Sequence, residues 1–449
     1  MDPGLLSFIG ILVGLAALMF FAFKGVPMLV LAPTCGVIIG LFSGTGVWPT
    51  LSEFFMPGFA TFTRNFFLLL MMSAIFGKFM EESGAARNIA IGILKLAYKF
   101  PQKYQKTAAC FAMSMISAVL TYGGISLFVV TFTTVAIGRT IYEKMDVPWG
   151  FTLAGALGSA TFTMTMLPGS PQLTNLVAIP YLGTTPMAGP ILGIIASVIM
   201  VAMGLWYYQF ALKRYEKKGE GFLPTGAEII KVMPAQELDL SPGGGGKLLL
   251  SLVPSVVMLL LMNLPFLKWE PTLCLVVATL VCYLVFFPEF KGKSLKAIIT
   301  AGNNNAMLAV ANTSAVLGFG QVVANVAGFQ FIVGALEHVP GPPIVQMLVA
   351  VEIAAGITGS SSGGLGIAMG ALAERFLNMG IHPQAIHRLG AIAAGGLDSL
   401  PHTTGLMTSL SASRLTHSQG YIHMFVISVV MPIIVVTIVA IIHVTTGIL

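Results

Sequence analysis

The sequence predicts an all-α, polytopic membrane protein with two inverted repeats of about five transmembrane helices each, and with a re-entrant hairpin and a broken helix in each repeat. The composition is the first reason: 56% of the 449 residues are hydrophobic and 9% are charged, too little polar surface for a soluble globule. Four matched breaks are the second reason. Gly/Ser-rich segments interrupt apolar stretches at 121–126 and 358–364, and proline-containing polar segments follow at 166–172 and 398–404. Unpaired backbone at membrane depth must be buried in protein or line a cavity, so the breaks indicate one shared polar site.

Ten apolar segments are candidates for crossings, for which about 20 residues suffice. They lie near residues 5–23, 26–43, 59–80, 148–165, 187–210, 248–264, 271–287, 298–319, 384–398 and 421–446. The segments 108–141 and 343–376 each hold two shorter apolar runs around a break, so we expect each to be a re-entrant hairpin. The first segment lacks the basic region and cleavage site of a signal peptide, so we expect it to be retained as a helix.

Basic residues set the expected orientation. They cluster at 95–106, 213–218 and 291–296, and all three clusters fall on the cytoplasmic side if the hairpins do not cross the membrane. Counting the hairpins as full crossings leaves one cluster on the wrong side. Both termini are then expected outside. Because topology accounts for the net charge of +6, we expect no nucleic-acid partner.

The chain divides at a polar stretch, residues 211–247, that mixes charges of both signs and ends in a glycine run. We expect this stretch to be a flexible cytoplasmic linker. It would join a first repeat, residues 1–210, to a second repeat, residues 248–449. Faint internal similarity, for example between 74–78 and 317–321, supports the same division.

The breaks are candidate ligand sites because a helix that stops inside a membrane exposes N–H groups at one end and carbonyls at the other. The first can hold a carboxylate and the second a cation. Tight helix packing through small residues is the alternative explanation, but the pairing of the breaks favours a ligand. The candidate substrate-binding residues are Thr121, Gly123, Gly124, Ser126, Ser170, Thr358, Ser360, Ser361, Ser362, Gly363, Gly364, Thr403 and Thr404.

Ionisable residues inside apolar segments are few and energetically expensive, so each is a functional candidate. Asp398 and His402 lie four residues apart in the last break, where they could bind a proton or lie beside a cation. The alternative is that Asp398 caps a helix and His402 satisfies backbone groups. Glu352, in the second hairpin, could also carry the coupling proton or could pair with a basic residue.

Other polar residues in the apolar segments are interpreted by type. Asn303, Asn304, Asn305 and Asn312 each bring an amide that must be satisfied, so we expect them to line the cavity. Arg64 is interpreted as a residue that extends toward the membrane surface. The four cysteines have no metal-ligand spacing, so buried thiols are expected, with no disulfide and no metal site.

Three runs, residues 309–320, 357–368 and 394–402, resemble the GntP family of gluconate-permease-like symporters in the ion transporter superfamily, and the likeness extends over essentially the whole chain. The resemblance implies a proton- or cation-coupled importer of small organic acid anions, multi-pass in a bacterial inner membrane. It also implies a homodimer with an elevator-type motion of a domain that holds both hairpins and both broken helices. Residues 400–404 resemble the branch for short-chain hydroxy acids such as 3-hydroxybutyrate.

The leading hypothesis is therefore a secondary active symporter, not an enzyme, for a small hydroxy- or keto-monocarboxylate. Its partners would be the carboxylate substrate, a coupling proton or sodium ion and membrane lipid, without a cofactor. A gluconate or sugar-acid permease is the alternative. A passive anion channel is less favoured because paired hairpins make a closed site. A membrane-embedded protease using Ser361 or Ser362 with His402 is the third hypothesis, although the chain has no HExxH motif and no phosphate-binding loop.

Overall fold

The computed structural model describes nearly the whole chain. The described residues are 2–24, 26–125, 127–233, 235, 245–264, 266–267, 269–331, 334, 338–401 and 403–449. Every regular element within these ranges is a helix, which confirms the all-α class.

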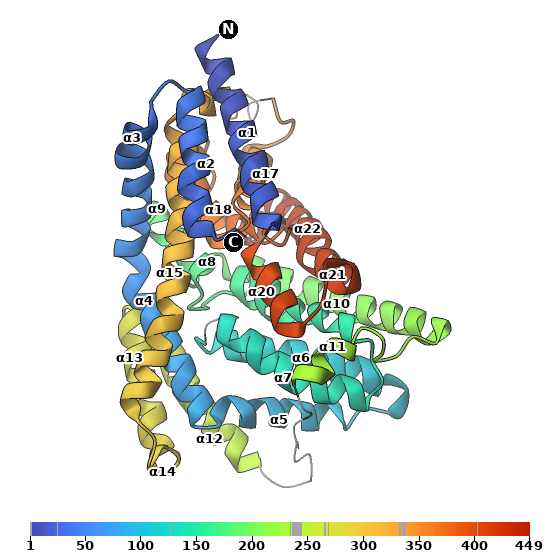
Figure 1. Cartoon of the computed structure of the whole chain (residues 1–449). Helices are drawn as coiled ribbons and strands as arrows, with labels where there is room; N and C mark the ends of the chain where they lie inside the picture. The colour runs from blue at the N-terminus through green and yellow to red at the C-terminus, as the bar shows by residue number, and fades with distance from the viewer. Residues whose placement is uncertain are drawn as a thin grey trace.

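Two long helices, α4 and α15, lie side by side through the length of the molecule and are called the central pair (Figure 1). Their bounds are Met56–Glu82 and Leu295–Asn325, and the short α3 (Val47–Pro49) and the π-helix η1 (Thr50–Phe55) extend α4 at its N-terminus. Glycine allows the close approach, since a Cβ on Gly302 would lie 2.8 Å from the Cα of Ile75. The Thr63 and Ser314 hydroxyls join the two helices over 2.8 Å.

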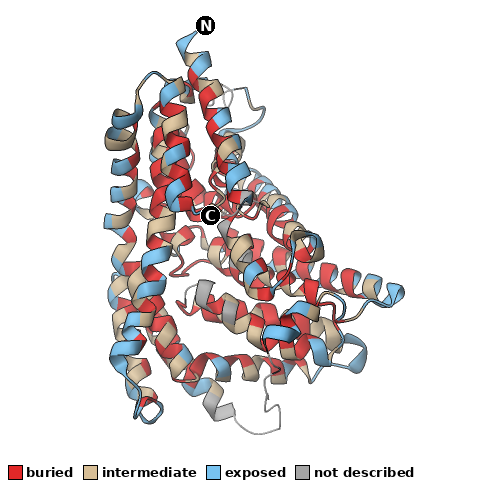
Figure 2. Cartoon of the chain, viewed as in Figure 1, coloured by how far each residue is buried: buried red, intermediate tan, exposed pale blue. Residues whose placement is uncertain are grey.

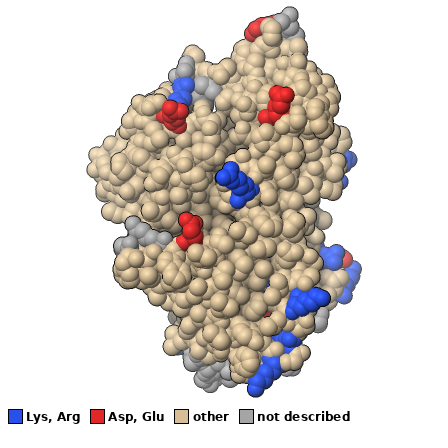
Figure 3. Space-filling view, turned by 90° about the vertical axis from the view of Figure 1, so that its left-hand side faces the viewer, with Lys and Arg blue, Asp and Glu red and all other residues tan. Residues whose placement is uncertain are grey.

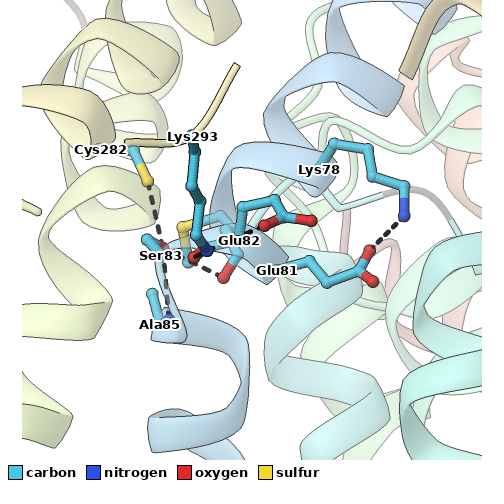
Figure 4. Close-up of polar contacts among 8 residues, drawn as sticks. Lys78, Glu81, Glu82, Ser83, Ala85, Cys282 and Lys293 are labelled. Carbon is cyan, nitrogen blue, oxygen red and sulfur yellow. Dashed lines mark hydrogen bonds and ion pairs between the residues drawn. The ribbon is translucent and has the colours of Figure 1, made fainter. Parts of the chain in front are cut away.

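A helical hairpin flanks the central pair at each end (Figure 1). In the first, α1 packs on α2 and α2 packs on α15; in the second, α12 packs on α13 and α13 packs on α4. The bounds are α1 Pro3–Phe23, α2 Met28–Phe42, α12 Gly245–Asn263 and α13 Pro271–Val285. Figure 4 shows how one end of α4 is held. Lys293, after the short α14 (Phe287–Phe290), donates to Glu82 Oε2 at 2.9 Å, and Cys282 donates to the Ser83 hydroxyl at 3.6 Å.

Both segments expected to be hairpins are pairs of helices joined by a break. The pairs are α6 (Gln105–Tyr122) with α7 (Leu127–Lys144), and α17 (Pro343–Thr358) with α18 (Ser361–Asn378). Glycines with positive φ make both turns, Gly124 at +91° and Gly359 at +61°. Ser360 then starts α18 as its N-cap, since its hydroxyl accepts from Gly363 N at 3.1 Å.

The two helices expected to be broken are broken. The first consists of a 3₁₀ helix η3 (Trp149–Leu157) that continues as a π-helix η4 (Gly158–Met166), followed after the break by α8 (Leu173–Leu176) and α9 (Ile179–Leu182). The second consists of α19 (Pro383–Ala394) and α20 (Thr404–Ser413). α19 therefore ends four residues before the expected end of the segment 384–398, and the break begins at the Gly395–Gly396 pair.

The remaining helices surround these elements. They are α5 (Ala85–Ala97), the 3₁₀ turn η2 (Gln102–Tyr104), α10 (Pro190–Lys218), α11 (Ala227–Val232), α21 (His417–Phe425), the π-helix η5 (Val426–Val430) and α22 (Met431–Thr446). α5 lies across one end of the bundle (Figure 1) and buries Ile89 and Leu94.

The prediction of a flexible linker over 211–247 was wrong for residues 211–233. α10 runs unbroken to Lys218, and the following segment folds back onto the protein. Phe222 N donates to Asp146 Oδ1 at 2.9 Å, and Phe222 and Ile229 are 4% and 0% exposed. The polar composition reflected an amphipathic surface rather than missing structure. Residues 236–244, which hold part of the glycine run, lie outside the described residues.

The surface is that of a multi-pass membrane protein. Large apolar side chains such as Trp206, 66% exposed, and Val198, 64% exposed, lie on outer helix faces, while the facing sides of the helices are buried (Figure 2). The face in Figure 3 is mostly uncharged, with basic side chains gathered toward its lower end. All four cysteines are buried and free, as expected.

Among the described residues, five helical segments are long and apolar enough to cross a membrane. They are Pro3–Ala22, Val47–Glu82, Pro190–Lys218, Leu295–Asn325 and His417–Thr446. The other apolar helices have 10–17 residues, so the count of ten crossings stays a prediction.

Candidate functional site

A cavity of about 250 Å³ lies where both hairpins and both broken helices meet the central pair. The central pair contributes Leu70 and Asn312, and the first hairpin contributes Ser117 and Thr131. The other polar side chains that line it are Thr134, Thr152, Ser159, Gln172, Thr313, Thr358, Ser360, Ser361, Ser362, Asp398, Ser399, Thr408 and Ser409. The structure thus brings together breaks that are more than 200 residues apart in the sequence.

The lining is rich in hydroxyl groups and contains a single ionisable side chain. Among the described lining residues, Asp398 is the one ionisable side chain, and none is Lys, Arg or His. An anion in this cavity would therefore be held by hydroxyl and main-chain donors. The first residues of α18 and of α20 also line the cavity, so two helix N-termini add partial positive charge.

The tip of the second hairpin lies at the cavity, as the sequence predicted. Thr358, Ser360, Ser361 and Ser362 all line it. The hydroxyl of Ser361 lies 3.0 Å from that of Thr174 in α8, so the tip also joins the two halves of the chain.

Gly363 and Gly364 lie behind this tip and do not line the cavity. A Cβ on Gly364 would lie 2.2 Å from the Cα of Ala355, and one on Gly363 would lie 3.1 Å from a Val316 methyl group. These two glycines therefore serve helix packing, which the sequence offered as the alternative.

The tip of the first hairpin is turned into the protein instead. Thr121, 0% exposed, forms a hydroxyl contact of 2.6 Å with Thr163, and Ser170 accepts from Gln172 N. Gly123 and Gly124 pack against α12, where added Cβ atoms would lie 2.6 Å from Ser255 Oγ and from Met258 Sδ, respectively. None of these four predicted substrate-binding residues lines the cavity, although Gln172 beside them does.

Asp398 lies in the break of the second broken helix, between α19 and α20, and lines the cavity. The Ser399 hydroxyl donates to its Oδ1 at 2.7 Å. The capping alternative was wrong, because the N-cap of α20 is Thr403. Thr403 is 1% exposed and does not line the cavity. His402 and Ser126 lie outside the described residues, as does the side chain of Thr404.

Glu352 lies on α17, outside the cavity lining. Its Oε1 lies close to the break between α19 and α20, 3.4 Å from the position that a Cβ on Gly396 would occupy. Among the described Lys and Arg residues, none forms an ion pair with it. The pairing alternative is therefore absent from the part of the chain that the structure covers.

The asparagines divide by helix face. Asn312 lines the cavity, whereas Asn303, Asn304 and Asn305 do not, and the last two are exposed on the surface of α15. Arg64 is likewise exposed on α4.

Two buried basic residues of α19 were not predicted. Arg388 is 0% exposed and donates to the Ala188 and Pro186 carbonyls at 2.9 and 3.2 Å. His387 contacts the Thr184 hydroxyl through Nδ1 at 2.6 Å. Adjacent ionisable residues inside an apolar segment were the available signal, because such residues must find partners when buried.

The described geometry around Ser361 differs from the nucleophile elbow of a hydrolase. Residues 359–363 do match the Gly-x-Ser-x-Gly spacing of a nucleophile elbow, with Ser361 at its centre. A nucleophile elbow follows a β-strand, whereas this run follows helix α17. The Ser361 hydroxyl contacts the Thr174 hydroxyl at 3.0 Å and also forms a hydrogen bond with the Asp398 carboxylate.

Comparison with known proteins adds a relative and a fold. No family model matches the chain. It is 32% identical to a Bacillus subtilis (strain 168) protein described as uncharacterized transporter YxjC, over 94% of this chain and 95% of that one. The crystal structure of the Alcanivorax borkumensis YdaH transporter is similar in fold, with a TM-score of 0.54 over 100% of this chain and 99% of that one, at 14% identity.

Proposed function

Since the chain belongs to the family of the Bacillus subtilis transporter YxjC, we propose that it is a secondary active symporter for a small hydroxy- or keto-monocarboxylate, such as 3-hydroxybutyrate. The co-transported ion would be a proton or another cation. The proposal starts from a multi-pass membrane protein whose fold is similar to that of a transporter. The substrate and its coupling rest on the chemistry of the cavity.

The observation that carries the proposal is a small cavity between the two hairpins and the two broken helices, with a lining rich in hydroxyls and one carboxylate. Its volume of about 250 Å³ lies below the range of drug-sized sites, so it suits a small metabolite. Hydroxyls and helix N-termini can hold a carboxylate without a basic side chain. A ligand hydroxyl could donate to Gln172 Oε1, and Asn312 could serve a ligand hydroxyl or carbonyl.

Asp398 gives a physical reason for coupling. An anionic substrate about 4 Å from an ionised Asp398 would be repelled by ~4 kcal/mol at an effective dielectric constant of 20. A proton on Asp398, or a cation beside it, removes that repulsion. Substrate binding and cation binding would then favour each other, which is what symport requires.

We further propose that the central pair, with α1–α2 and α12–α13 at its ends, forms the scaffold of a homodimer in a bacterial inner membrane. The pairs α6–α7 and α17–α18 and the two broken helices would move together as one unit. The packing supports this division. α2 of the first half packs on α15 of the second half, and α13 of the second half packs on α4 of the first half. Inverted repeats would produce such a reciprocal arrangement.

Uptake into proteoliposomes tests the function. Labelled 3-hydroxybutyrate, with gluconate as comparator, is offered under separately imposed pH and sodium gradients. Accumulation against the substrate gradient is expected for the wild type. Asp398→Asn should reduce it by about tenfold or more, because each 1.4 kcal/mol of coupling is a factor of ten. Glu53→Gln is the matched control, because the Glu53 carboxylate is exposed and lies far from Asp398 in the sequence.

Three results would contradict parts of the proposal. Equilibration without accumulation would indicate a channel, and accumulation of gluconate alone would indicate a sugar-acid permease. Undiminished coupling in Asp398→Asn would remove Asp398 from the coupling step.

A further inference from the structure

The carbonyls at the tip of the first hairpin are occupied by side-chain donors. Gln172 Nε2 donates to Thr121 O and, at 3.4 Å, to Ile125 O. Ser73 Oγ donates to Gly124 O at 2.8 Å. The orientation of the Gln172 amide is fixed by these partners, because a carbonyl can only accept and only Nε2 can donate.

Carbonyls in the break of the first broken helix, residues 167–172, also accept hydrogen bonds from side chains. The Tyr122 hydroxyl donates to Pro168 O at 2.7 Å, and Asn263 Nδ2 donates to Gly169 O at 3.0 Å. The Arg388 guanidinium, described above, adds a permanent positive charge next to this break. Side chains of both halves therefore donate to the carbonyls that the breaks of the first half expose, with Gln172, Ser73 and Tyr122 from the first half and Asn263 and Arg388 from the second.

The second half differs at its hairpin tip. Among the described residues, no side-chain amide or guanidinium donates to a carbonyl of residues 358–360, where the Thr358 hydroxyl donates to Ser360 O. In the break after α19, the Tyr421 hydroxyl donates to Ser399 O at 3.2 Å and His417 Nε2 contacts Pro401 O at 3.0 Å. A carboxylate, Asp398, also lies in this break and lines the cavity. Exposed carbonyls and a carboxylate are the groups that attract a cation at a broken helix.

We propose that the Gln172 amide fills the cation position of the first repeat, so that only the second repeat binds a coupling cation and one cation accompanies each substrate. This inference rests on the proposed symport. It makes Gln172 a residue that sets the coupling stoichiometry while the overall architecture of the two halves stays similar.

Gln172→Glu tests the proposal by gain of function. A carboxylate in place of the amide would face the Thr121 and Ile125 carbonyls with no donor between them, so it would recruit a cation. We expect the order of uptake in the coupling cation to rise from first to second. In detergent, sodium and pH titrations should each be followed by thermal unfolding, and one of them should raise Tm by roughly 2–5 °C more than in the wild type.

Gln419→Glu is the matched control, because Gln419 already acts as an acceptor, with its Oε1 accepting from Thr416 N at 2.9 Å. It should keep first-order dependence. Gln172→Ser is the second variant, since it leaves both carbonyls without the amide and should bind the extra cation more weakly.

Unchanged cation order and unchanged cation-dependent Tm in both Gln172 variants would overturn the proposal. A wild type that already takes two cations per substrate would also overturn it and would leave the symport itself intact. A wild type that accumulates no acid would contradict the proposed function instead, and the Tm titrations would still test Gln172 directly.

Discussion

Arg388 is a buried cation whose described hydrogen bonds go to main-chain carbonyls rather than to a carboxylate. Arg388→Met should remove hydrogen bonds to three main-chain carbonyls, of which Pro186 O keeps Gly169 N and Asn175 Nδ2 as donors, at a cost of about 1–3 kcal/mol. We expect a clear fall in the Tm of the purified protein, and partial recovery in Arg388→Lys. A Tm equal to that of the wild type would show that these bonds contribute little to stability.

Gly364 sets the distance between α17 and α18. Gly364→Ala would place a Cβ 2.2 Å from the Cα of Ala355, so the two helices must separate and the tip must move. We expect substrate uptake to fall by about tenfold or more, because misplacement of a binding group by about 1 Å is costly. Gly370→Ala, on the same helix, is the control, since its Cβ would meet its nearest neighbour at an ordinary 3.5 Å.

At the scale of elements, one aromatic side chain contributes much of the packing that holds the segment after α10 on the protein. Phe222 packs against Trp149, with ring centroids 5.9 Å apart, and is 4% exposed. Phe222→Ala should cost about 3–5 kcal/mol of local packing and release residues 219–233. Limited proteolysis should then cut this segment faster. Phe210→Ala, at a 51% exposed position of α10, should not change the rate.

The sequence predicted those elements whose signals are local. Glycine, serine and proline mark the turns at Gly124 and Gly359, and both hairpins and both broken helices follow from them. The linker was misjudged because its composition is polar while its contacts, such as Phe222 N to Asp146, join residues 76 positions apart. No local pattern reveals such a partner.

The site was predictable in part for the same reason. The second tip and Asp398 were found because hydroxyls and a carboxylate in an apolar segment are conspicuous. The first tip was expected to be equivalent, yet it is covered by donors from distant parts of the chain, including Ser73 and Gln172. Asn304 was placed in the cavity by residue type alone, whereas the orientation of its helix face puts it on the surface.

At the scale of the whole molecule, the two halves share one cavity but contribute unlike chemistry to it. The contact between Thr174 and Ser361 spans 187 positions of the chain and lies at the buried junction of the halves. The lining extends from Leu70 to Met424 in the sequence.

This wide spacing has a consequence for biosynthesis. While the ribosome is still translating the second half, the hydroxyl-rich walls of the first half have no opposite wall to close against. The nascent protein must shelter those polar surfaces, within the insertion machinery or against other helices, for the time needed to synthesise more than two hundred further residues. The cavity therefore cannot be complete until α21, which contributes Met424, has been inserted.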